Sequence, residues 1–487
     1  MIINFTVKNF MSFKDKITVC FAASKLTKYN YRIAKSKKNN LDILPIAAFF
    51  GANASGKSNL IKALAAIKTI ITRQPILQSN YNRSYIIPYA LDNNKEATTF
   101  AIEFLLIVNG EEKIYEFSIC LNNTIIFKEK LLEIINGSET CIYQRELLEK
   151  KDDDGNNTYS YEVNECLYKT NFDTNNSNEN DSDEKKQEKE NENKLIMKLS
   201  NKIAAKSNQL FLHKVSENGI KFFEPIINWF RYNLQIVPKN RHNVYNLMDT
   251  QTMQVYINTL YEKDTDSFKK FNQYLQQLDN NIAGLDFIEI DNNIHFNRNQ
   301  AKLNIKKFKY IGYEIFDKIQ RIYMKYDEKQ QRIITKKLVT CHKTAENKII
   351  NFDLRMESDG NLQLLDILPM LYHLQQLNQQ KKQQENNYVL IIDEIDSSWH
   401  GLLTKKLLRN YLDTCNNNTR TQLLFTTHDN NLLDTLELMR LDEEYLINND
   451  SGSSSISSVI EFKDIKFDQV RKYYMHRLIG GVPEFEE

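Results

Sequence analysis

Features that would mark a secreted or membrane protein are missing from this sequence of 487 residues. Its six cysteines include no C-x-x-C pair, so we interpret them as reduced thiols rather than as a disulfide or zinc framework. The amino terminus lacks the charged start and apolar run of a signal peptide. No apolar run approaches the roughly 18 residues of a membrane-spanning helix. We therefore expect a cytoplasmic protein with no membrane partner.

A large excess of charge of one sign is also missing. The chain has 64 basic and 63 acidic residues, which gives a formal net charge of +1. A protein that coats nucleic acid with its whole surface would be far more basic, so DNA could bind only at a local patch. Residues 1–45 and 301–340 have a local excess of lysine and arginine, which suits either such a patch or ordinary solvated faces.

Composition divides the chain into four predicted parts. Residues 1–150 are rich in short β-branched and aromatic runs, two of which are joined at Asn109-Gly110 as in a hairpin. Residues 151–194, dominated by polar and charged side chains, are predicted to be a low-complexity, flexible insertion. Residues 195–330 are predicted to be a mainly helical insertion, including a helix from Tyr310 to Lys329. Residues 331–487 return to alternating strands and helices.

The most informative motif is G-A-N-A-S-G-K-S at residues 51–58. An apolar run precedes it and a helical pattern follows it, as in a phosphate-binding loop between a strand and a helix. Lys57 would reach the β- and γ-phosphates of ATP, and the Ser58 hydroxyl would ligate Mg²⁺. The residues predicted to bind the nucleotide are Gly51, Asn53, Ala54, Ser55, Gly56, Lys57, Ser58 and Asn59.

Two later strands are predicted to end in polar residues. An apolar run, Tyr388 to Ile392, leads into Asp393, a predicted metal ligand, and Glu394, the predicted general base toward the attacking water. A second run, Gln422 to Thr426, leads to His428, whose side chain could contact a γ-phosphate. A helical pattern separates the two runs, which predicts a parallel sheet.

The order of these motifs resembles that of an ABC-type ATPase head, namely P-loop, signature, Walker B, D-loop and switch histidine. Ser358, Asp359 and Gly360 open a predicted helix at the place of the signature, and Ser397 and Ser398 stand at the place of the D-loop. The chain is most similar to SMC-like and OLD-like ATPases. Among these it resembles the AAA-annotated bacterial ATPases of abortive-infection and anti-phage systems, such as RloA-type proteins and the PARIS ATPase subunit.

The resemblance covers residues 1–131 and 340–487 and implies an α/β fold. This fold is a P-loop parallel sheet with an antiparallel β subdomain, here carrying a mainly helical insertion. The implied cofactors are ATP and Mg²⁺, and the implied catalytic residues are Lys57, Glu394 and His428. Asp359 departs from the glycine of many ABC heads, and no residue is assigned as the Q-loop glutamine.

The resemblance also implies that the chain associates with itself. In ABC heads the signature closes over ATP held by another copy, so Ser358, Asp359 and Gly360 would act in trans in a head-to-head dimer or higher oligomer. The predicted function is an ATP-hydrolysing switch, the sensor or regulatory subunit of an anti-phage system that holds or activates a separate nuclease or toxin. The alternatives are a DNA-repair or recombination ATPase of SMC-like or RecF-like type that clamps DNA, and a nucleotide-gated scaffold with little turnover.

Other signals point away from further activities in the chain. No heptad pattern is sustained over the repeats that the coiled-coil arms of SMC proteins need. Arg471 and His476 have the R-x-x-x-x-H spacing of HEPN ribonucleases, but they stand on a predicted lone helix. We therefore predict that the chain has no nuclease site of its own.

Overall fold

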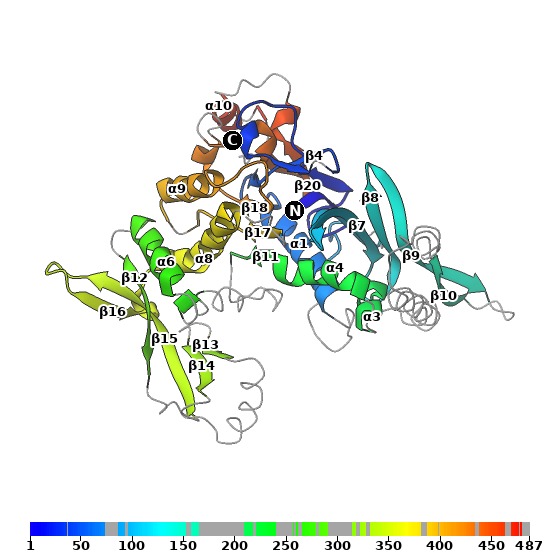
Figure 1. Ribbon diagram of the computed structural model, residues 1–487. Coiled ribbons are helices and arrows are strands. Elements are labelled where there is room, and N and C mark those ends of the chain that lie inside the picture. Colours follow the sequence, from blue (N-terminus) through cyan, green and yellow to red (C-terminus); the bar gives the residue numbers. More distant parts are fainter. Residues whose placement is uncertain are drawn as a thin grey trace. The chain divides into compact units, whose positions relative to one another are not determined.

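The computed structural model describes residues 1–36, 38–73, 86–92, 96–151, 157–164, 209–217, 221–239, 257, 260–261, 265–278, 282–290, 314–317, 322–327, 332–380, 387–397, 399–433, 438–462, 469–476 and 478–479. The chain divides into two compact units. The first unit comprises Met1–Met248, Leu374–Ser397 and Leu408–Glu487, and the second comprises Asp249–His373 and Ser398–Leu407. Segments from both ends of the sequence therefore build the first unit, as the blue and red ribbons of Figure 1 show.

One sheet of the first unit has six strands in the order β11-β17-β18-β5-β19-β20 (Figure 1). Neighbouring strands are parallel except β19 and β20, which confirms the predicted parallel sheet. Strands β5, β17 and β18 are buried along their whole length, which explains their uninterrupted apolar sequences. The bounds are β5 (Ile46–Phe50), β11 (Leu234–Val237), β17 (Tyr388–Ile392), β18 (Thr421–Thr426), β19 (Glu444–Asp450) and β20 (Ser453–Ser458).

The other large sheet of this unit is antiparallel, with the order β10-β9-β8-β7-β6-β1-β2. Strands β6 and β7 pair up to the turn at Asn109-Gly110, so the predicted hairpin is confirmed. The predicted α/β head, with a parallel sheet and an antiparallel β subdomain, is thus the fold observed. The bounds are β1 (Ile2–Lys8), β2 (Ile17–Cys20), β6 (Thr98–Val108), β7 (Glu111–Leu121), β8 (Ile126–Ile135), β9 (Ser138–Lys151) and β10 (Asn157–Asn164).

The start of the predicted flexible insertion needs a correction. Residues 157–164 lie within the 151–194 segment, yet they form β10, which pairs antiparallel with β9 along its whole length. Backbone pairing with a neighbouring strand gives order to a polar sequence that could not build a core by itself. Residues 165–194 lie outside the described part of the chain.

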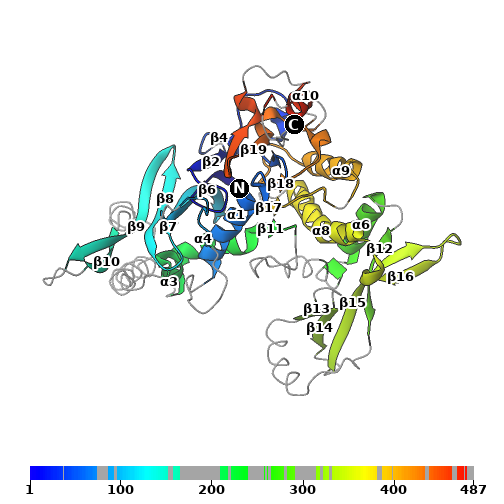
Figure 2. The ribbon, with the colours of Figure 1, turned by 180° about the vertical axis from the view of Figure 1, so that it is seen from behind.

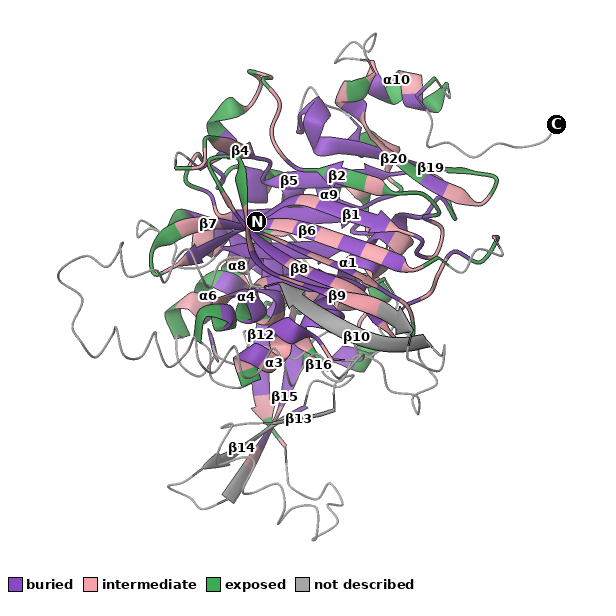
Figure 3. Cartoon of the chain, turned by 90° about the vertical axis from the view of Figure 1, so that its right-hand side faces the viewer, coloured by how far each residue is buried: buried purple, intermediate pink, exposed green. Residues whose placement is uncertain are grey.

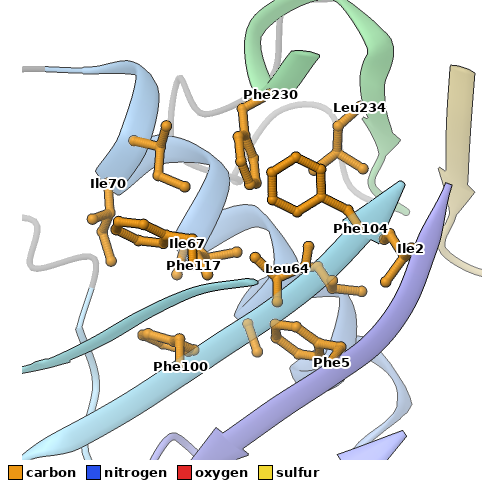
Figure 4. Packing of buried hydrophobic residues seen from close by; sticks show 14 of the residues in the cluster. Ile2, Phe5, Leu64, Ile67, Ile70, Phe100, Phe104, Phe117, Phe230 and Leu234 are labelled. Atoms are coloured by element: carbon orange, nitrogen blue, oxygen red, sulfur yellow. The ribbon is translucent and has the colours of Figure 1, made fainter. Parts of the chain in front are cut away.

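Helix α1 (Lys57–Thr72) packs between the two sheets (Figures 1 and 2). Its apolar side chains join one buried cluster with residues of both sheets, and Figure 3 shows how far the strands of this unit are buried. Phe104 of β6 stacks on Trp229, with ring centroids 4.6 Å apart. Figure 4 labels part of this cluster: Ile2, Phe5, Leu64, Ile67, Ile70, Phe100, Phe104, Phe117, Phe230 and Leu234.

Shorter elements complete the first unit. Helical turns lie between residues 211 and 233, within the segment predicted to be mainly helical, and they add aromatic side chains to the cluster around α1. The bounds are η1 (Asn30–Arg32), β3 (Ala34–Ser36), β4 (Leu41–Ile43), α3 (Phe211–Glu217), η3 (Lys221–Phe223), α4 (Glu224–Asn228), η4 (Trp229–Asn233), η6 (Asn430–Leu432), η7 (Leu441–Glu443), η8 (Val459–Glu461) and α10 (Val470–Met475).

The second unit is built around a third sheet, with the order β12-β15-β14-β13 and β16 paired to β15. Helices α8 and α9 contribute residues to both units. No helix of the described residues is long and apolar enough to cross a membrane. The bounds are α6 (Thr265–Leu278), β12 (Ile282–Glu289), β13 (Glu314–Asp317), β14 (Ile322–Asp327), β15 (Arg332–Lys343), β16 (Ile349–Asp353), η5 (Leu354–Met356), α8 (Asp359–Gln379) and α9 (Gly401–Leu412).

The helix predicted from Tyr310 to Lys329 is wrong, because residues 314–317 and 322–327 are the antiparallel strands β13 and β14. Both strands contain isoleucine and aromatic residues, which favour strands, and β14 also pairs with β15. At four and six residues, the two strands are too short to show a helical or strand period in the sequence. Residues 195–330 therefore contain strands beside their helices rather than being mainly helical.

A buried cluster around Arg440 ties the two ends of the chain together. The Arg440 guanidinium is fully buried and contacts Asp442 through Nε at 2.8 Å and Nη2 at 2.7 Å. It also donates to the backbone carbonyls of Ser24, Leu26 and Lys28. Since the Ser24 N–H and hydroxyl both donate to Asp442, the pair fixes the 24–28 segment against the carboxyl-terminal part of the first unit.

Replacing Arg440 by methionine should destabilise the first unit strongly. The substitution keeps much of the apolar volume but leaves Asp442 as a buried charge without its guanidinium, and removing one partner of a buried pair costs about 3–5 kcal/mol of unfolding free energy. Chemical denaturation would measure the loss. Lys38→Met is the control, because its pair with Glu111 is exposed. Equal unfolding midpoints for the two variants would contradict the importance of the cluster.

Candidate nucleotide site

The predicted site residues follow three neighbouring strands of the six-stranded sheet, β17, β18 and β5. Ile392 of β17 lies opposite Val237 of β11 on one side and Phe425 of β18 on the other. Phe425 in turn lies opposite Ala48 of β5. Because these strands are parallel, their carboxyl ends meet at one edge, where α/β sheets bind ligands. The P-loop, the Asp393-Glu394 pair and His428 are therefore brought to one place.

Two close approaches shape the P-loop. A Cβ atom at Gly51 would lie 2.5 Å from the Ile447 carbonyl oxygen and 2.6 Å from Ser55 Oγ. Gly56 has a φ of 114°, and a Cβ atom there would collide with Ser454 Oγ and lie 2.9 Å from Ser12 Oγ. Glycine is thus required at both ends of the loop by space, and at Gly56 also by backbone conformation.

Two serines that the sequence analysis did not assign to the site brace the loop. The Ser454 hydroxyl, on β20, donates to the Ser55 carbonyl at 2.6 Å, and its oxygen lies 2.7 Å from Ser12 Oγ, within hydrogen-bond distance. Asn59 Nδ2 donates to Ser12 Oγ at 2.8 Å, so the predicted nucleotide residue Asn59 contacts this brace. Ser12 stands in the amino-terminal segment that carried the family resemblance, whereas no motif pointed to Ser454.

The loop fits a phosphate ligand. Asn53 and Ala54 are exposed at its tip, whereas the Ser55 hydroxyl is buried and makes no hydrogen bond to the described residues. The loop leads directly into α1, whose first N–H groups favour an anion. The Ser55 hydroxyl could therefore donate a hydrogen bond to a phosphate oxygen that lies at the amino terminus of α1.

The Lys57 ammonium lies inside the loop. It donates to the carbonyl oxygens of Gly51 at 2.7 Å and Ala52 at 2.8 Å. Burial lowers the pKa of Lys57 to about 8, although the nearby carboxylates of Glu394 and Asp393 act in the opposite direction. The Lys57 ammonium is thus held in a position where it could contact the phosphates of a nucleotide bound in the loop.

Asp393 and Ser58 lie together at the end of the loop. The Thr426 hydroxyl donates to Asp393 Oδ1 at 2.6 Å. Burial raises the pKa of Asp393, and hydrogen bonds from Thr426 and Ser58 oppose this rise. The two predicted metal ligands therefore face each other and offer only oxygen atoms, the donor type that Mg²⁺ prefers.

These two oxygen donors would not complete a metal site by themselves. Among the described residues, no group of three or more His, Cys, Asp or Glu side chains could hold a metal ion. Mg²⁺ is usually held by one or two protein oxygens, with water and substrate phosphates completing its shell. Ser58 and Asp393 fit that pattern.

Glu394 is held in an unusual backbone conformation. Its φ is 52°, and its N–H donates to Thr426 Oγ1 at 2.7 Å. Its carboxylate is 10% exposed, and His428 Nε2 lies 3.4 Å from Oε1. The His428 N–H donates to Asp396 Oδ2 at 3.1 Å. The predicted base and the predicted switch histidine are thus in contact.

A lysine that the sequence analysis missed contacts the same carboxylate. Lys239 follows β11, and its ammonium lies 2.6 Å from Glu394 Oε2. The only sequence signal would have been its position after an apolar run, and that run is short. Ser397, of the predicted D-loop, is exposed, and its N–H donates to the Glu394 carbonyl at 3.2 Å. Ser398 lies outside the described residues.

The predicted signature residues belong to the second unit. Ser358 and Asp359 are exposed, and Gly360 is half-buried, at the start of α8. The Ser358 hydroxyl accepts the Asn361 N–H at 3.2 Å, as a helix-capping residue does. The structure thus places all three residues at an accessible helix amino terminus.

The buried side chain of Glu357 holds the residues of the predicted signature in place. Its side chain is 3% exposed and lies 2.6 Å from His342 Nε2. It also accepts hydrogen bonds from Thr340 on β15 and from Asn361 on α8. Burial alone would raise the pKa of Glu357, but the hydrogen bonds from Asn361, Thr340 and His342 hold it below its usual value. The first turn of α8 is therefore fixed to β15.

Of the R-x-x-x-x-H pair of the sequence, Arg471 lies on α10 and His476 is the residue that directly follows this helix. Arg471 and His476 are both exposed. The helix is six residues long. The carboxyl-terminal residues that carried part of the family resemblance, 480–487, lie outside the described part of the chain.

Comparison with models of known protein families assigns the chain to a family. A family model described as "AAA domain, putative AbiEii toxin, Type IV TA system" matches residues 46–434. This range is well over half of the chain and includes the P-loop, the predicted signature, the acidic pair and His428. Comparison with curated proteins gave no match.

Two solved structures resemble the chain over most of its length. One is described as "Crystal structure of the SmcHead bound to the C-winged helix domain of ScpA"; it is 12% identical, with a TM-score of 0.41, and covers 94% of this chain and 97% of that one. The other is "SMC head domain from Thermotoga maritima", 12% identical, with a TM-score of 0.33 and coverage of 94% and 98%.

Gly56→Ala should abolish tight nucleotide binding while the protein stays folded. Alanine is strained at this φ, and its Cβ would displace the Ser454 hydroxyl that braces the loop, so the affinity for ATP should fall more than about tenfold. Binding of a fluorescent ATP analogue would measure the change. Gly137→Ala is the matched control, because Gly137 also has positive φ but no atom lies within 4 Å of a Cβ there. Equal affinities in the two variants would show that the loop does not hold the phosphates.

Proposed function

The chain belongs to this AAA-domain family, and we propose that it is a Mg²⁺-dependent ATP hydrolase of the ABC/SMC-like head type that works as a molecular switch. The observation that carries the proposal is the meeting of Lys57, the Ser58–Asp393 pair and Glu394 at one sheet edge. Phosphoryl transfer needs a cation on the phosphates, a metal ligand pair and a group that directs water, and these residues supply them.

Each residue has a distinct proposed task. The P-loop backbone and Lys57 would hold the β- and γ-phosphates, and Ser58 and Asp393 would hold the metal. Bound Mg²⁺ would neutralise charge that develops on the phosphate oxygens. Glu394 accepts a proton from the attacking water, and His428 lies beside it at the γ-phosphate end of the site.

We propose that the signature works in trans. Ser358 and Asp359 are exposed at the amino terminus of α8, where N–H groups and the helix dipole favour a phosphate from outside. A chain with one P-loop and one signature then needs a second copy to complete a site, and a symmetric dimer completes two. ATP binding would join the heads, and hydrolysis would release them.

The proposed biological setting is a cytoplasmic anti-phage or abortive-infection system. The family description names a type IV toxin–antitoxin system, which supports a setting of this kind. Within it, the chain would resemble RloA-type proteins or the PARIS ATPase subunit. It would act as the sensor or regulatory subunit that holds or activates a separately encoded nuclease or toxin.

The alternative of a DNA clamp gains no support from three of the lysines of residues 1–45. Lys8 pairs with Glu96 at 2.8 Å, Lys14 with Asp92 at 3.1 Å and Lys38 with Glu111 at 3.0 Å. Side chains paired in this way leave less positive charge for phosphates than the sequence count indicates. Residues 301–313 of the second basic segment lie outside the described residues.

Glu394→Gln should stop turnover without preventing ATP binding. The amide keeps the size of the side chain but cannot take a proton from water, so the hydrolysis rate should fall about 10²- to 10⁴-fold. ATP should then accumulate on the protein and stabilise the oligomer, which size-exclusion chromatography with ATP would reveal. Glu96→Gln, which changes an exposed carboxylate of the same unit, is the control. Undiminished turnover in the Glu394 variant would refute the assignment of the base.

A mixing experiment tests the trans signature. Lys57→Ala and Ser358→Arg should each be inactive alone, because one lacks the P-loop cation and the other blocks the signature. After subunit exchange, about half of the dimers are mixed and each has one intact site, so about a quarter of the wild-type rate should return.

The control mixture combines Lys57→Ala with Glu394→Gln. Both changes lie in the first unit at one nucleotide site, so no mixed dimer has an intact site and no activity should return. Failure of the Lys57→Ala and Ser358→Arg mixture to recover would argue against a signature supplied by a second copy.

A further inference from the structure

Lys239 lies at the same sheet edge as the proposed catalytic residues. β11 ends at Val237, which pairs with Ile392 of β17. The pairing continues one residue further, because the Asp393 N–H donates to the Val237 carbonyl at 2.9 Å. The backbones that carry Lys239 and Glu394 are therefore fixed side by side.

The ammonium of Lys239 contacts both oxygens of the Glu394 carboxylate. Nζ lies 2.6 Å from Oε2 and 2.8 Å from Oε1. The lysine side chain is 49% exposed, whereas that of Glu394 is 10% exposed. A charge-assisted contact with both oxygens restricts the rotation of a carboxylate, so the lysine fixes the direction in which Glu394 points.

Glu394 needs such support for two reasons. Its φ of 52° is a costly conformation for a residue with a side chain, and it persists only where the surroundings enforce it. Its neighbour Asp393 carries the same charge and already receives the hydroxyls of Ser58 and Thr426. The Lys57 ammonium donates to loop carbonyls, whereas the Lys239 ammonium contacts the Glu394 carboxylate directly.

We propose that Lys239 is a positioning residue for the general base Glu394. The inference rests on the proposed function and deepens it. Lys239 acts through Glu394, by holding its carboxylate in the working direction, and not by binding the nucleotide. The rate of the chemical step should therefore depend on Lys239, while the concentration of ATP needed for half-maximal rate should not.

Steady-state hydrolysis by the full-length protein tests this role. Lys239→Met should lower kcat about ten- to a hundredfold with KM for ATP unchanged, because a misdirected base loses rate but not binding. Lys239→Arg, which keeps a cation able to contact both oxygens, should recover most of the rate. Lys269→Met, at an exposed position on α6, is the control for loss of one lysine.

A double variant separates positioning from independent action. In a Glu394→Gln background, Lys239→Met should cause no further loss, because the group it orients is already gone. A further loss of equal size, a raised KM, or an unchanged or higher kcat in the single variant would overturn the role of Lys239 and leave the proposed function intact. Absence of hydrolysis by the wild type would overturn the proposed function, and this inference with it.

Discussion

The register of the parallel strands is the constraint on which the rest of the site depends. Ile392, Phe425 and Ala48 lie opposite one another on β17, β18 and β5. Thr426, one residue further on, can therefore donate to the Asp393 carboxylate and accept the Glu394 N–H with the same hydroxyl. A shift of one residue in any of these strands would turn alternate side chains to the other face and separate groups that stand more than 300 positions apart in the sequence.

The second constraint on the site is the negative charge of its two buried carboxylates. Asp393 and Glu394 are adjacent and largely buried, and buried carboxylates are stable only with partners. The hydroxyls of Thr426 and Ser58 form hydrogen bonds with Asp393, and Lys239 forms an ion pair with Glu394. A nucleotide would add further negative charge to this edge, against which the chain itself offers Lys57 and the amino terminus of α1. At this edge of the sheet, each buried carboxylate thus has a partner that compensates its negative charge.

Local signals explain what the sequence could predict. The P-loop, the acidic pair and the β6–β7 hairpin are each written in a few consecutive residues, and the apolar strands beside them predicted the parallel sheet. Lys239 and Ser454 could not be found in this way, since the residues that they contact, Glu394 for Lys239 and Ser12 and Ser55 for Ser454, are distant in sequence. The strands β13 and β14 were missed for another reason: they are only four and six residues long, and neither alternates apolar with polar residues.

The proposed trans arrangement depends on the first turn of helix α8. At its first turn, Glu357 joins Asn361 to β15 in the second unit. The Asn361 amide and the His342 ring both contact the buried Glu357 carboxylate, so the start of the helix is fixed within its own unit. The signature offered to a second copy is therefore not on a free loop: it is the first turn of a helix that hydrogen bonds hold to a neighbouring strand.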